Sequence, residues 1–467
     1  MKILLVKAGY TKNYGQLVPP LGLFYVSGAL KAGGYSDIRL FEADLHKNPE
    51  RKFSEELEDF GPDVVGISAI TAEALSLHAL ARRAAAAKRR PVIIAGGTHA
   101  SAYLKDCAAD GNLDFIVRGE AEGSIVELLR GLGENAGFEK IKGISYRKNG
   151  APVHNPAREP LMDLDKLPFP DWEIADFENY TKGIPHSPLL YTRKYMKILT
   201  SRGCPYGCVY CHNTHGKIFR KHSAGRVIEE VSILRNKYGI RDLEITDDIF
   251  NLDAERAKAI LRGLKEKTPD VSLFFSNGLR TDLLDRELMD LMKEANTKFV
   301  CVAVETASPA LQEKIGKRMD LGKLRTNAAY LTKKKIFVNG FFMIGFPGET
   351  LKELFTTVRF LLSLPIHTFM MSYCLAYEGT KLAESVPPEK RVDPARDVSP
   401  YYSIWGFVNC SDLKDYQLVT AKLLSNVFFY FFFPMRWYRI LRDLPYRNSG
   451  VLLLLFKKLL TRSVFPR

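Results

Sequence analysis

The sequence contains no uninterrupted apolar stretch of about 18 residues, the length that a membrane-spanning helix needs. Its apolar start, Met1–Val6, is followed by a lysine and is too brief for the core of a signal peptide. The cysteines form no separated pairs, and four of them are scattered along the chain: Cys107, Cys301, Cys374 and Cys410. We therefore expect no spanning helix, no export signal and no disulfide framework, and we expect reduced thiols in the cytoplasm.

The chain has 467 residues, which is too long for one ordinary hydrophobic core and predicts two or three domains. Its net charge of +14 is compatible with nucleic acid, an anionic membrane surface or anionic ligands. Half of this excess lies in residues 434–467, which contain eight Arg or Lys residues and one acidic residue. Because these cations alternate with aliphatic residues, nucleic acid is the least favoured partner.

Three other cysteines, Cys204, Cys208 and Cys211, lie close together in one glycine-containing run, Ser201–His212. Three thiolates on one short loop can bind three irons of a cubane [4Fe-4S] cluster, which prefers soft sulfur ligands. The fourth iron then has no protein ligand in this loop and is free to bind a substrate or cofactor.

A structural zinc site is the main alternative for this loop, because His212 or His215 could complete a Cys3His set. Structural zinc ligands usually come as two separated pairs, and no second pair exists in the sequence. The spacing therefore favours the cluster and leaves a non-catalytic iron–sulfur or zinc protein as an alternative of another class.

The spacing Cys-x3-Cys-x-aromatic-Cys, with Tyr210 as the aromatic residue, resembles the signature of the radical S-adenosylmethionine (radical SAM) superfamily. The resemblance implies that the methionine amine and carboxylate of SAM chelate the fourth iron. It also implies an enzyme in which SAM is cleaved to a 5′-deoxyadenosyl radical.

Residues 1–145 alternate short apolar runs with helix-like stretches and predict a parallel, doubly wound α/β domain. The expected strands are Lys2–Val6, Asp37–Phe41, Asp63–Ser68, Pro91–Ala95 and Asp114–Val117. The expected helices are near 20–33, 50–59, 72–88, 101–109 and 121–131. Ligands of such sheets bind beyond the carboxyl ends of the strands.

The loops after three of these strands carry hydroxyls, exposed amides and glycines that allow a flat ligand to approach the backbone. The candidate residues are Ser68, Thr71, Gly96, Gly97, Thr98, His99, Gly119 and Glu120. The runs Pro19–Leu23, Gly96–Ala100 and Arg118–Glu120 resemble the cobalamin-binding domain that precedes the radical SAM core in one large subclass. That subclass includes the anaerobic cyclase of magnesium-protoporphyrin monomethyl ester, and the resemblance implies a flavodoxin-like fold that binds cobalamin through these residues.

The first loop departs from the cobalamin pattern, because Ala8–Asn13 lacks the histidine that ligates cobalt in the motif Asp-x-His-x-x-Gly. His46 follows the second strand, lacks the glycine of that motif and is interpreted as a surface-loop histidine. We therefore expect that this motif's histidine does not occupy the lower axial site of cobalt.

Residues 146–194 are rich in proline and predict a semi-rigid linker. Residues 195–385 predict the radical SAM core, an incomplete (β/α)6 TIM-like barrel whose chemistry lies at the carboxyl ends of its strands. The expected strands are Met196–Thr200, Leu243–Thr246, Leu273–Ser276, Phe299–Val304, Phe337–Ile344 and Phe369–Leu375. The expected helices are near 224–238, 253–267, 284–294, 322–334 and 350–363, and the cysteine loop is expected directly after the first strand.

Polar or glycine residues end each later strand, and the resemblance makes them candidates for SAM binding. Together with the aromatic of the cysteine motif they are Tyr210, Asp247, Asp248, Asn277, Arg280, Glu305, Asn339 and Gly345. The carboxylates of Asp247 and Asp248 suit the SAM ammonium, or they cap the following helix. Glu305 suits the ribose or the amine, or it pairs with a nearby Arg or Lys.

Residues 386–467 predict a helical, basic and apolar C-terminal extension. Its aromatic residues beside Arg and Lys fit a peripheral membrane contact, and they also fit a tail packed on the barrel. The resemblance to the subclass implies a cobalamin-dependent C-methyltransferase, and the apolar tail suggests a small hydrophobic substrate. A flavodoxin or ferredoxin would supply the electron. The alternative is a non-methylating radical cyclisation or oxidation.

Overall fold

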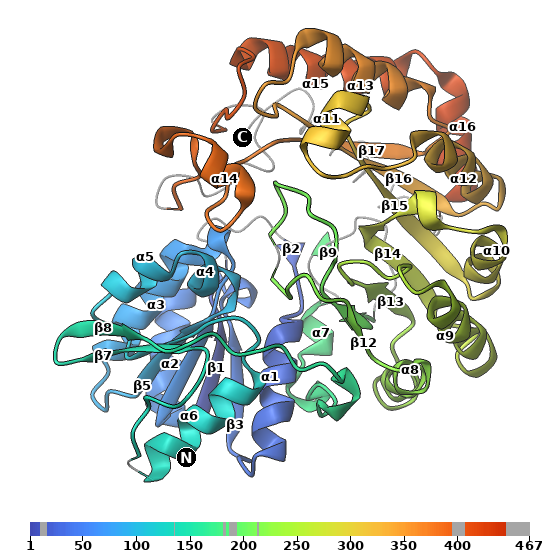
Figure 1. The fold of residues 1–467 in the computed structure, drawn as a ribbon. Helices are drawn as coiled ribbons and strands as arrows, with labels where there is room; N and C mark the ends of the chain where they lie inside the picture. The colour runs from blue at the N-terminus through green and yellow to red at the C-terminus, as the bar shows by residue number, and fades with distance from the viewer. Residues whose placement is uncertain are drawn as a thin grey trace. The chain divides into compact units, whose positions relative to one another are not determined.

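The computed structural model describes residues 1–9, 16–134, 136–180, 184–185, 194–212, 214–394 and 407–444 (Figure 1). The chain divides into two compact units, of which the first comprises mainly Met1–Ile184 and the second mainly Pro185–Val392 with the C-terminal helices. Each unit contains its own large sheet, so each is described separately.

The first unit is built on a seven-stranded sheet in the order β3-β1-β4-β5-β6-β7-β8. Its strands are β1 (Ile3–Lys7), β3 (Ile38–Glu42), β4 (Val64–Ser68), β5 (Val92–Gly96), β6 (Phe115–Val117), β7 (Ile144–Lys148) and β8 (Ala151–His154). The first five strands are parallel in the flavodoxin-like order, as expected from the sequence. The last two form an antiparallel hairpin, so the expected boundary at residue 145 falls inside this sheet.

Two hydrophobic cores cover the two faces of this sheet. Helices α2 (Pro49–Phe60), α3 (Ala74–Ala85) and α5 (Leu104–Ala109) contribute to one core. Helices α1 (Leu21–Ala32) and α6 (Glu122–Glu134) contribute to the other. The sequence analysis placed Gly97 to His99 in a loop, whereas the structure places them in the short helix α4 (Gly97–Ala102). The unit also contains α7 (Phe177–Tyr180) and the two-residue strand β2 (Gln16–Leu17).

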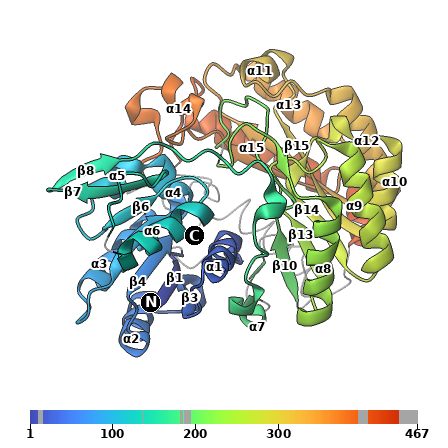
Figure 2. The same ribbon diagram turned by 60° about the horizontal axis from the view of Figure 1, so that its bottom comes forward.

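The second unit contains a six-stranded parallel sheet whose strands follow one another in chain order, as in an incomplete barrel. The strands are β10 (Tyr195–Ile198), β13 (Asp242–Ile245), β14 (Ser272–Leu279), β15 (Thr297–Glu305), β16 (Phe337–Ile344) and β17 (Thr368–Tyr373). The helices between them are α8 (Ala224–Tyr238), α9 (Ala254–Lys267), α10 (Arg286–Glu294), α11 (Pro309–Lys314), α12 (Leu321–Lys333) and α13 (Leu351–Ser363). Figure 2 shows α8, α9, α10 and α12 on the outer side of this sheet.

Polar side chains at the N-cap positions fix where several of these helices begin. Ser223, Asp253, Asp285 and Thr350 each accept a hydrogen bond from the backbone N–H three residues later, at the starts of α8, α9, α10 and α13. Helix α11 was not expected from the sequence, and Ser308 caps it in the same way.

A short antiparallel pair, β11 (Ser201–Arg202) and β12 (Arg220–Lys221), closes the base of the cysteine loop. The sequence analysis expected the loop directly after the first barrel strand, so β11 is an additional element between them. Its backbone bonds to β12 hold the two ends of the loop together.

The chain then continues through α14 (Lys381–Ser385) to α15 (Asp415–Phe431) and α16 (Pro434–Asp443). Helix α15 packs beside α13, and its Phe429 ring lies 4.8 Å from that of Phe369 in β17 (Figure 1). Among the described residues no single helix is long and apolar enough to cross a bilayer. In the described part of the chain, α15 and α16 taken together are the one pair that passes that test, and they are bent by 78°.

Candidate cofactor-binding sites

The cysteine loop is held by close backbone contacts that require glycine. Gly203 has a φ of +83°, and a Cβ atom there would lie 2.2 Å from the carbonyl oxygen of Ile218. Gly316, in the segment after α11, has a φ of +69°, and its Cβ would lie 2.9 Å from the carbonyl oxygen of Gly207. Any other residue would therefore strain the backbone and displace the loop.

The pKa values of two of the three cysteines are shifted by their surroundings. Burial raises the pKa of Cys204 and raises that of Cys211 to about 11, and the nearby Cys208 contributes to both shifts. The Cys208 sulfur lies 3.8 Å from the carbonyl oxygen of Gly316. Cys211 is exposed and Cys204 and Cys208 are half-buried, so the loop is accessible, and a positively charged metal group would bind the three sulfurs as thiolates. The loop therefore fits an iron–sulfur cluster.

The zinc alternative gains little from the structure. His212 has its Nε2 atom 2.8 Å from the carbonyl oxygen of Glu378, and His215 has its Nδ1 atom 3.1 Å from an Asp248 carboxylate oxygen. Each of these contacts uses one ring nitrogen, and a zinc-bound histidine commonly makes such a contact through its other nitrogen. Among the described residues, the metal-ligating atoms of His78, His99, Asp106 and Cys107 lie within 4.8 Å of one another, close enough to share one metal ion. The sulfurs of the three loop cysteines do not form such a group. The spacing of the cysteine sulfurs, rather than the histidine contacts, therefore disfavours zinc.

The two carboxylates after β13 have different surroundings. Asp247 is buried and accepts hydrogen bonds from the Thr200 N–H at 2.6 Å, the Thr200 hydroxyl at 2.6 Å and the Ser201 hydroxyl at 2.5 Å. Asp248 accepts a bond from the Gly203 N–H at 2.9 Å. Burial opposes its charge, but the contacts from His215 and Gly203 keep the pKa of Asp248 below its ordinary value. Asp247 therefore joins two strand ends, and Asp248 is the charged group beside the cysteine loop.

Glu305 ends β15 with a φ of +63°, a left-handed conformation that is costly for a residue with a side chain. Its carboxylate lies 3.3 Å from the Lys317 ammonium, which matches the alternative of a nearby cation. Strained residues cluster at ligand-binding sites, so this backbone conformation marks the end of β15 as a candidate site. Asn277, at the end of β14, is exposed and donates to the Asp247 carbonyl oxygen at 2.9 Å.

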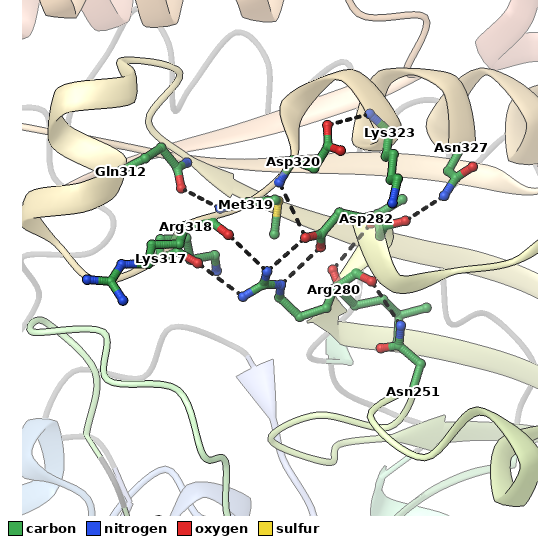
Figure 3. A network of polar contacts seen from close by, with 12 residues as sticks. Asn251, Arg280, Asp282, Gln312, Lys317, Arg318, Met319, Asp320, Lys323 and Asn327 are labelled. Atoms are coloured by element: carbon green, nitrogen blue, oxygen red, sulfur yellow. Dashed lines mark hydrogen bonds and ion pairs between the residues drawn. The ribbon is translucent and has the colours of Figure 1, made fainter.

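Arg280 lies in a polar network that the structure already satisfies (Figure 3). Its guanidinium contacts both carboxylate oxygens of Asp282, at 3.0 and 2.8 Å. It also donates to the carbonyl oxygens of Lys317 and Arg318. The guanidinium carbon lies 4.2 Å from the ring centre of Tyr206, in the cysteine loop. Arg280 therefore positions the loop rather than offering free donors to SAM.

The last three SAM candidates line β16 and the cysteine loop. Gly345 directly follows β16 with a φ of +83°, and its N–H donates to the buried carboxylate of Glu349 at 2.5 Å. Asn339 lies within the strand, and its amide oxygen accepts a bond from the Thr368 hydroxyl at 2.8 Å. Tyr210 packs edge-on against Phe346 with 5.9 Å between ring centres. Gly345 is buried with its N–H bonded to Glu349, and Asn339 is half-buried, so their roles in binding SAM stay predictions.

The cobalamin candidates lie at the carboxyl ends of three neighbouring strands, β4, β5 and β6. Gly97 has a φ of +89°, and a Cβ atom would lie 2.6 Å from the carbonyl oxygen of Ala69. Gly119 has a φ of +73°, and its N–H donates to the Ser101 hydroxyl at 2.9 Å. A Cβ atom at Gly119, which precedes Glu120, would have no atom within 4 Å, so the space beside this residue is open. This edge fits a flat ligand that contacts backbone.

The histidines of the first unit are engaged within it. His99 is fully buried, and its Nε2 lies 3.0 Å from the Asp106 carboxylate, which also contacts His78 at 2.9 Å. His46 stacks on Phe41 at 5.0 Å, and burial lowers its pKa. His99 is therefore buried in helix α4, its Nδ1 has no hydrogen-bond partner among the described residues, and its role in binding cobalamin stays a prediction. Residues 10–13 of the first loop lie outside the described residues.

The sequence analysis missed a group of buried ionisable residues at the carboxyl ends of β1 and β3. Lys7 ends β1 and forms an ion pair with Asp44, and its ammonium also donates to the Val18 carbonyl oxygen at 3.0 Å. Glu42 ends β3 and accepts a hydrogen bond from the Tyr180 hydroxyl. Burial raises the pKa of Glu42 to about 7. The sequence did contain a signal for this group, because Lys7 and Glu42 are charged residues that each end an apolar strand.

Family models recognise both units. Residues 8–129 match the B12 binding domain, and residues 198–361 match the radical SAM superfamily. The first match contains the strand ends with the glycine loops, and the second contains the cysteine loop. These matches define the class of protein to which the two units correspond.

Similar proteins narrow the class. The chain is 31% identical over 397 residues to the uncharacterized methyltransferase PH0819 of Pyrococcus horikoshii, covering 82% of this chain and 83% of that protein. It is 28% identical to cytidylyl-2-hydroxyethylphosphonate methyltransferase of Streptomyces wedmorensis, covering 85% and 83%. The structure of the radical SAM methyltransferase TsrM from Kitasatospora setae, solved with cobalamin and a [4Fe-4S] cluster, has a TM-score of 0.65 at 19% identity. That likeness covers 80% of this chain and 72% of TsrM, and it supports the fold.

The chain therefore belongs to the cobalamin-dependent radical SAM methyltransferases. The predictions of the superfamily, of the two α/β folds, of a methyltransferase and of its three cofactors are confirmed at the level of this family. The comparisons do not identify the substrate.

Proposed function

We propose that this protein transfers a methyl group to an unactivated carbon of a small hydrophobic molecule. Cys204, Cys208 and Cys211 would bind the [4Fe-4S] cluster. The observation that carries this proposal is the cysteine loop, fixed by Gly203 and Gly316 beside the strand end that carries Asp248. When bound, the cluster and SAM supply the radical that removes a hydrogen atom, and cobalamin supplies the methyl group.

The SAM-binding roles are assigned by position at the carboxyl ends of the barrel strands. Asp248 and Glu305 are the carboxylates that suit the SAM amine or ribose, and the backbone beside Gly345 suits the adenine edge. Asp247 and Arg280 hold the ends of β10 and the cysteine loop in place. Asn277 adds an exposed amide at the neighbouring strand end.

The cobalamin-binding roles fall to the carboxyl edge of the first sheet. The backbone of Gly96, Gly97 and Gly119 would contact the corrin, and the Ser68 and Thr71 hydroxyls would bond its amide groups. Thr98 and Glu120 border the same edge. Flavodoxin or ferredoxin would provide the electron that the cluster needs.

The proposal is tested by anaerobic incubation of reconstituted protein with methyl-labelled SAM, cobalamin, a reductant and lipid or isoprenoid extracts of the host. We expect label in an apolar product together with 5′-deoxyadenosine. Stoichiometric 5′-deoxyadenosine with no label in any product would contradict methylation and favour a radical cyclisation or oxidation. The variant Cys208→Ala, prepared in parallel, separates enzymatic label transfer from chemical background.

A further inference from the structure

Exposed apolar side chains are concentrated in one segment of the second unit. Half of the exposed large apolar side chains in the described part of the chain lie between Tyr416 and Leu441. The side chains of Phe431 and Phe432 are 72% and 63% exposed, and those of Met435 and Tyr438 are 61% and 57% exposed. Single exposed apolar residues are common on soluble proteins, but a contiguous group of this kind marks a contact surface.

Helix α15 is apolar on two faces, and the barrel covers only one of them. Leu418 and Phe429 are buried, and Phe429 packs against β17. Leu424, Phe428 and Phe431 follow one another at helical spacing on the outer face and are exposed. The expected packing of the tail on the barrel therefore accounts for the inner face alone. A helix that is apolar on both faces needs a second apolar environment.

The outer face combines apolar and cationic residues. Helix α16 exposes Met435, Tyr438 and Leu441, and it also carries the half-buried Arg439 and the exposed Arg442, which pairs with Asp443. The sequence of residues 434–467 contains eight Arg or Lys residues and one acidic residue, and five of the eight lie outside the described residues. Aromatic rings beside arginines suit the boundary between lipid headgroups and acyl chains, and the positive charge suits anionic lipid.

The lengths of the two helices favour a position in this boundary over a crossing of the bilayer. Helix α15 has 17 residues and α16 has 10, whereas a spanning helix needs about 20. The 78° bend between them places the exposed rings of Phe431 and Phe432 at the corner. A protruding apolar corner can enter the headgroup region while the rest of the barrel stays in water.

We propose that the outer face of α15 and α16 binds the surface of an anionic lipid bilayer. This aromatic face consists of Tyr416, Leu424, Val427, Phe428, Phe431, Phe432, Phe433, Met435, Tyr438 and Leu441. The inference does not depend on the proposed methylation, because it concerns a surface that can be tested without SAM or substrate.

The experiment is co-sedimentation of the full-length reconstituted protein with vesicles of phosphatidylcholine, with and without one third phosphatidylglycerol. We expect binding to the anionic vesicles that weakens with salt. The variant Phe431→Ser/Phe432→Ser/Met435→Ser should lower this binding about tenfold or more, because it removes the apolar corner. Arg439→Gln should weaken binding to anionic vesicles several-fold and leave binding to neutral vesicles unchanged.

A matched control is Leu161→Ser/Met162→Ser, which removes two exposed apolar side chains from the first unit and should leave binding unchanged. Circular dichroism and the thermal midpoint verify folding of each variant. No binding by the unmodified chain would overturn the proposal, as would unchanged binding by the triple variant. A dimer that the triple substitution dissociates, with no vesicle binding, would assign the aromatic face to a second copy instead.

Discussion

Glu305 shows how one residue joins backbone strain to a candidate binding role. Its left-handed backbone conformation costs about 1–3 kcal/mol and persists only because the surrounding structure enforces it. The residue ends a barrel strand, and its carboxylate has one ion-pair partner, Lys317. A glycine would remove the strain, so a variant at this position can separate the backbone cost from the role of the carboxylate.

The variants Glu305→Gln and Glu305→Gly separate these effects. Both should weaken SAM binding about tenfold, because a hydrogen bond to a charged group contributes about 1.5–3 kcal/mol. Both variants leave the buried Lys317 ammonium without its carboxylate, but only Glu305→Gly relieves the backbone strain, so we expect Glu305→Gly to have a free energy of unfolding about 1–3 kcal/mol higher than Glu305→Gln. Equilibrium dialysis with SAM and urea unfolding measure the two quantities.

Glu313→Gln is the matched control, because Glu313 pairs with Arg318 on the surface and should affect neither quantity. Unchanged SAM affinity in both Glu305 variants would remove this residue from the SAM site. The sequence left open whether the Glu305 carboxylate binds SAM or pairs with a nearby cation such as Lys317. The position of Glu305 at a strand end does not show where a cation will lie in the fold.

At the scale of elements, the strand ends of the first unit contain buried acids that make its stability depend on pH. Glu42 ends β3, and Glu73 ends a 3-10 turn after β4 (Thr71–Glu73). Burial raises the pKa of each to about 7. The folded protein therefore holds protons that the unfolded chain releases above about pH 4.5. Stability from these groups is full below that pH and is lost as the pH rises to 7.

Replacing Glu42 by glutamine tests this dependence, because the amide resembles the protonated acid and can still accept the hydrogen bond from Tyr180. We expect the thermal midpoint of the unmodified protein to fall between pH 5 and pH 7.5, and the fall to be smaller in the variant. Thermal unfolding followed by circular dichroism at several pH values measures both. Equal pH profiles in the two proteins would show that Glu42 is ionised in the folded state.

Several elements could be predicted from the sequence and others could not. The apolar runs of β1, β4 and β16 identified the strands, because buried parallel strands are continuously hydrophobic. The β7–β8 hairpin was assigned to the linker, since its exposed residues and prolines resemble those of a loop. The short β11–β12 pair is only two residues long on each side and leaves no periodic signal.

At the scale of the whole molecule, the two sheets have separate cores, and the candidate groups for the cluster and for cobalamin lie in different units. Loss of one cofactor therefore need not remove the other. The cysteine loop is also fixed by β11, β12 and the Gly316 contact, so its anchoring does not depend on the cluster alone.

Cys208→Ala should consequently lose most of its iron and all SAM cleavage, while it still binds cobalamin with unchanged stoichiometry and stays folded. Iron analysis, the visible spectrum of bound cobalamin and the thermal midpoint give the three measurements. Cys107→Ala is the control, because this buried cysteine lies in the first unit and should keep its iron. Full iron content in Cys208→Ala would remove the cluster assignment on which the proposed function depends.

The sequence by itself determined the chemistry that the protein can perform. Three thiolates at fixed spacing favour a cluster with one open iron, and that information is local because all three lie on one loop. Periodic apolar runs likewise determined two α/β units, since burial patterns repeat along each element.

Only the tertiary structure decided which polar side chains remain available. Asp247 and Asp248 are equivalent in the sequence, yet one joins two strand ends and the other lies beside the cysteines. Arg280 is engaged by partners that lie two and about 37 residues away in the chain. The physical reason is that a hydrogen bond or ion pair forms with whatever the fold brings within about 3 Å, and separation in the sequence does not encode that distance.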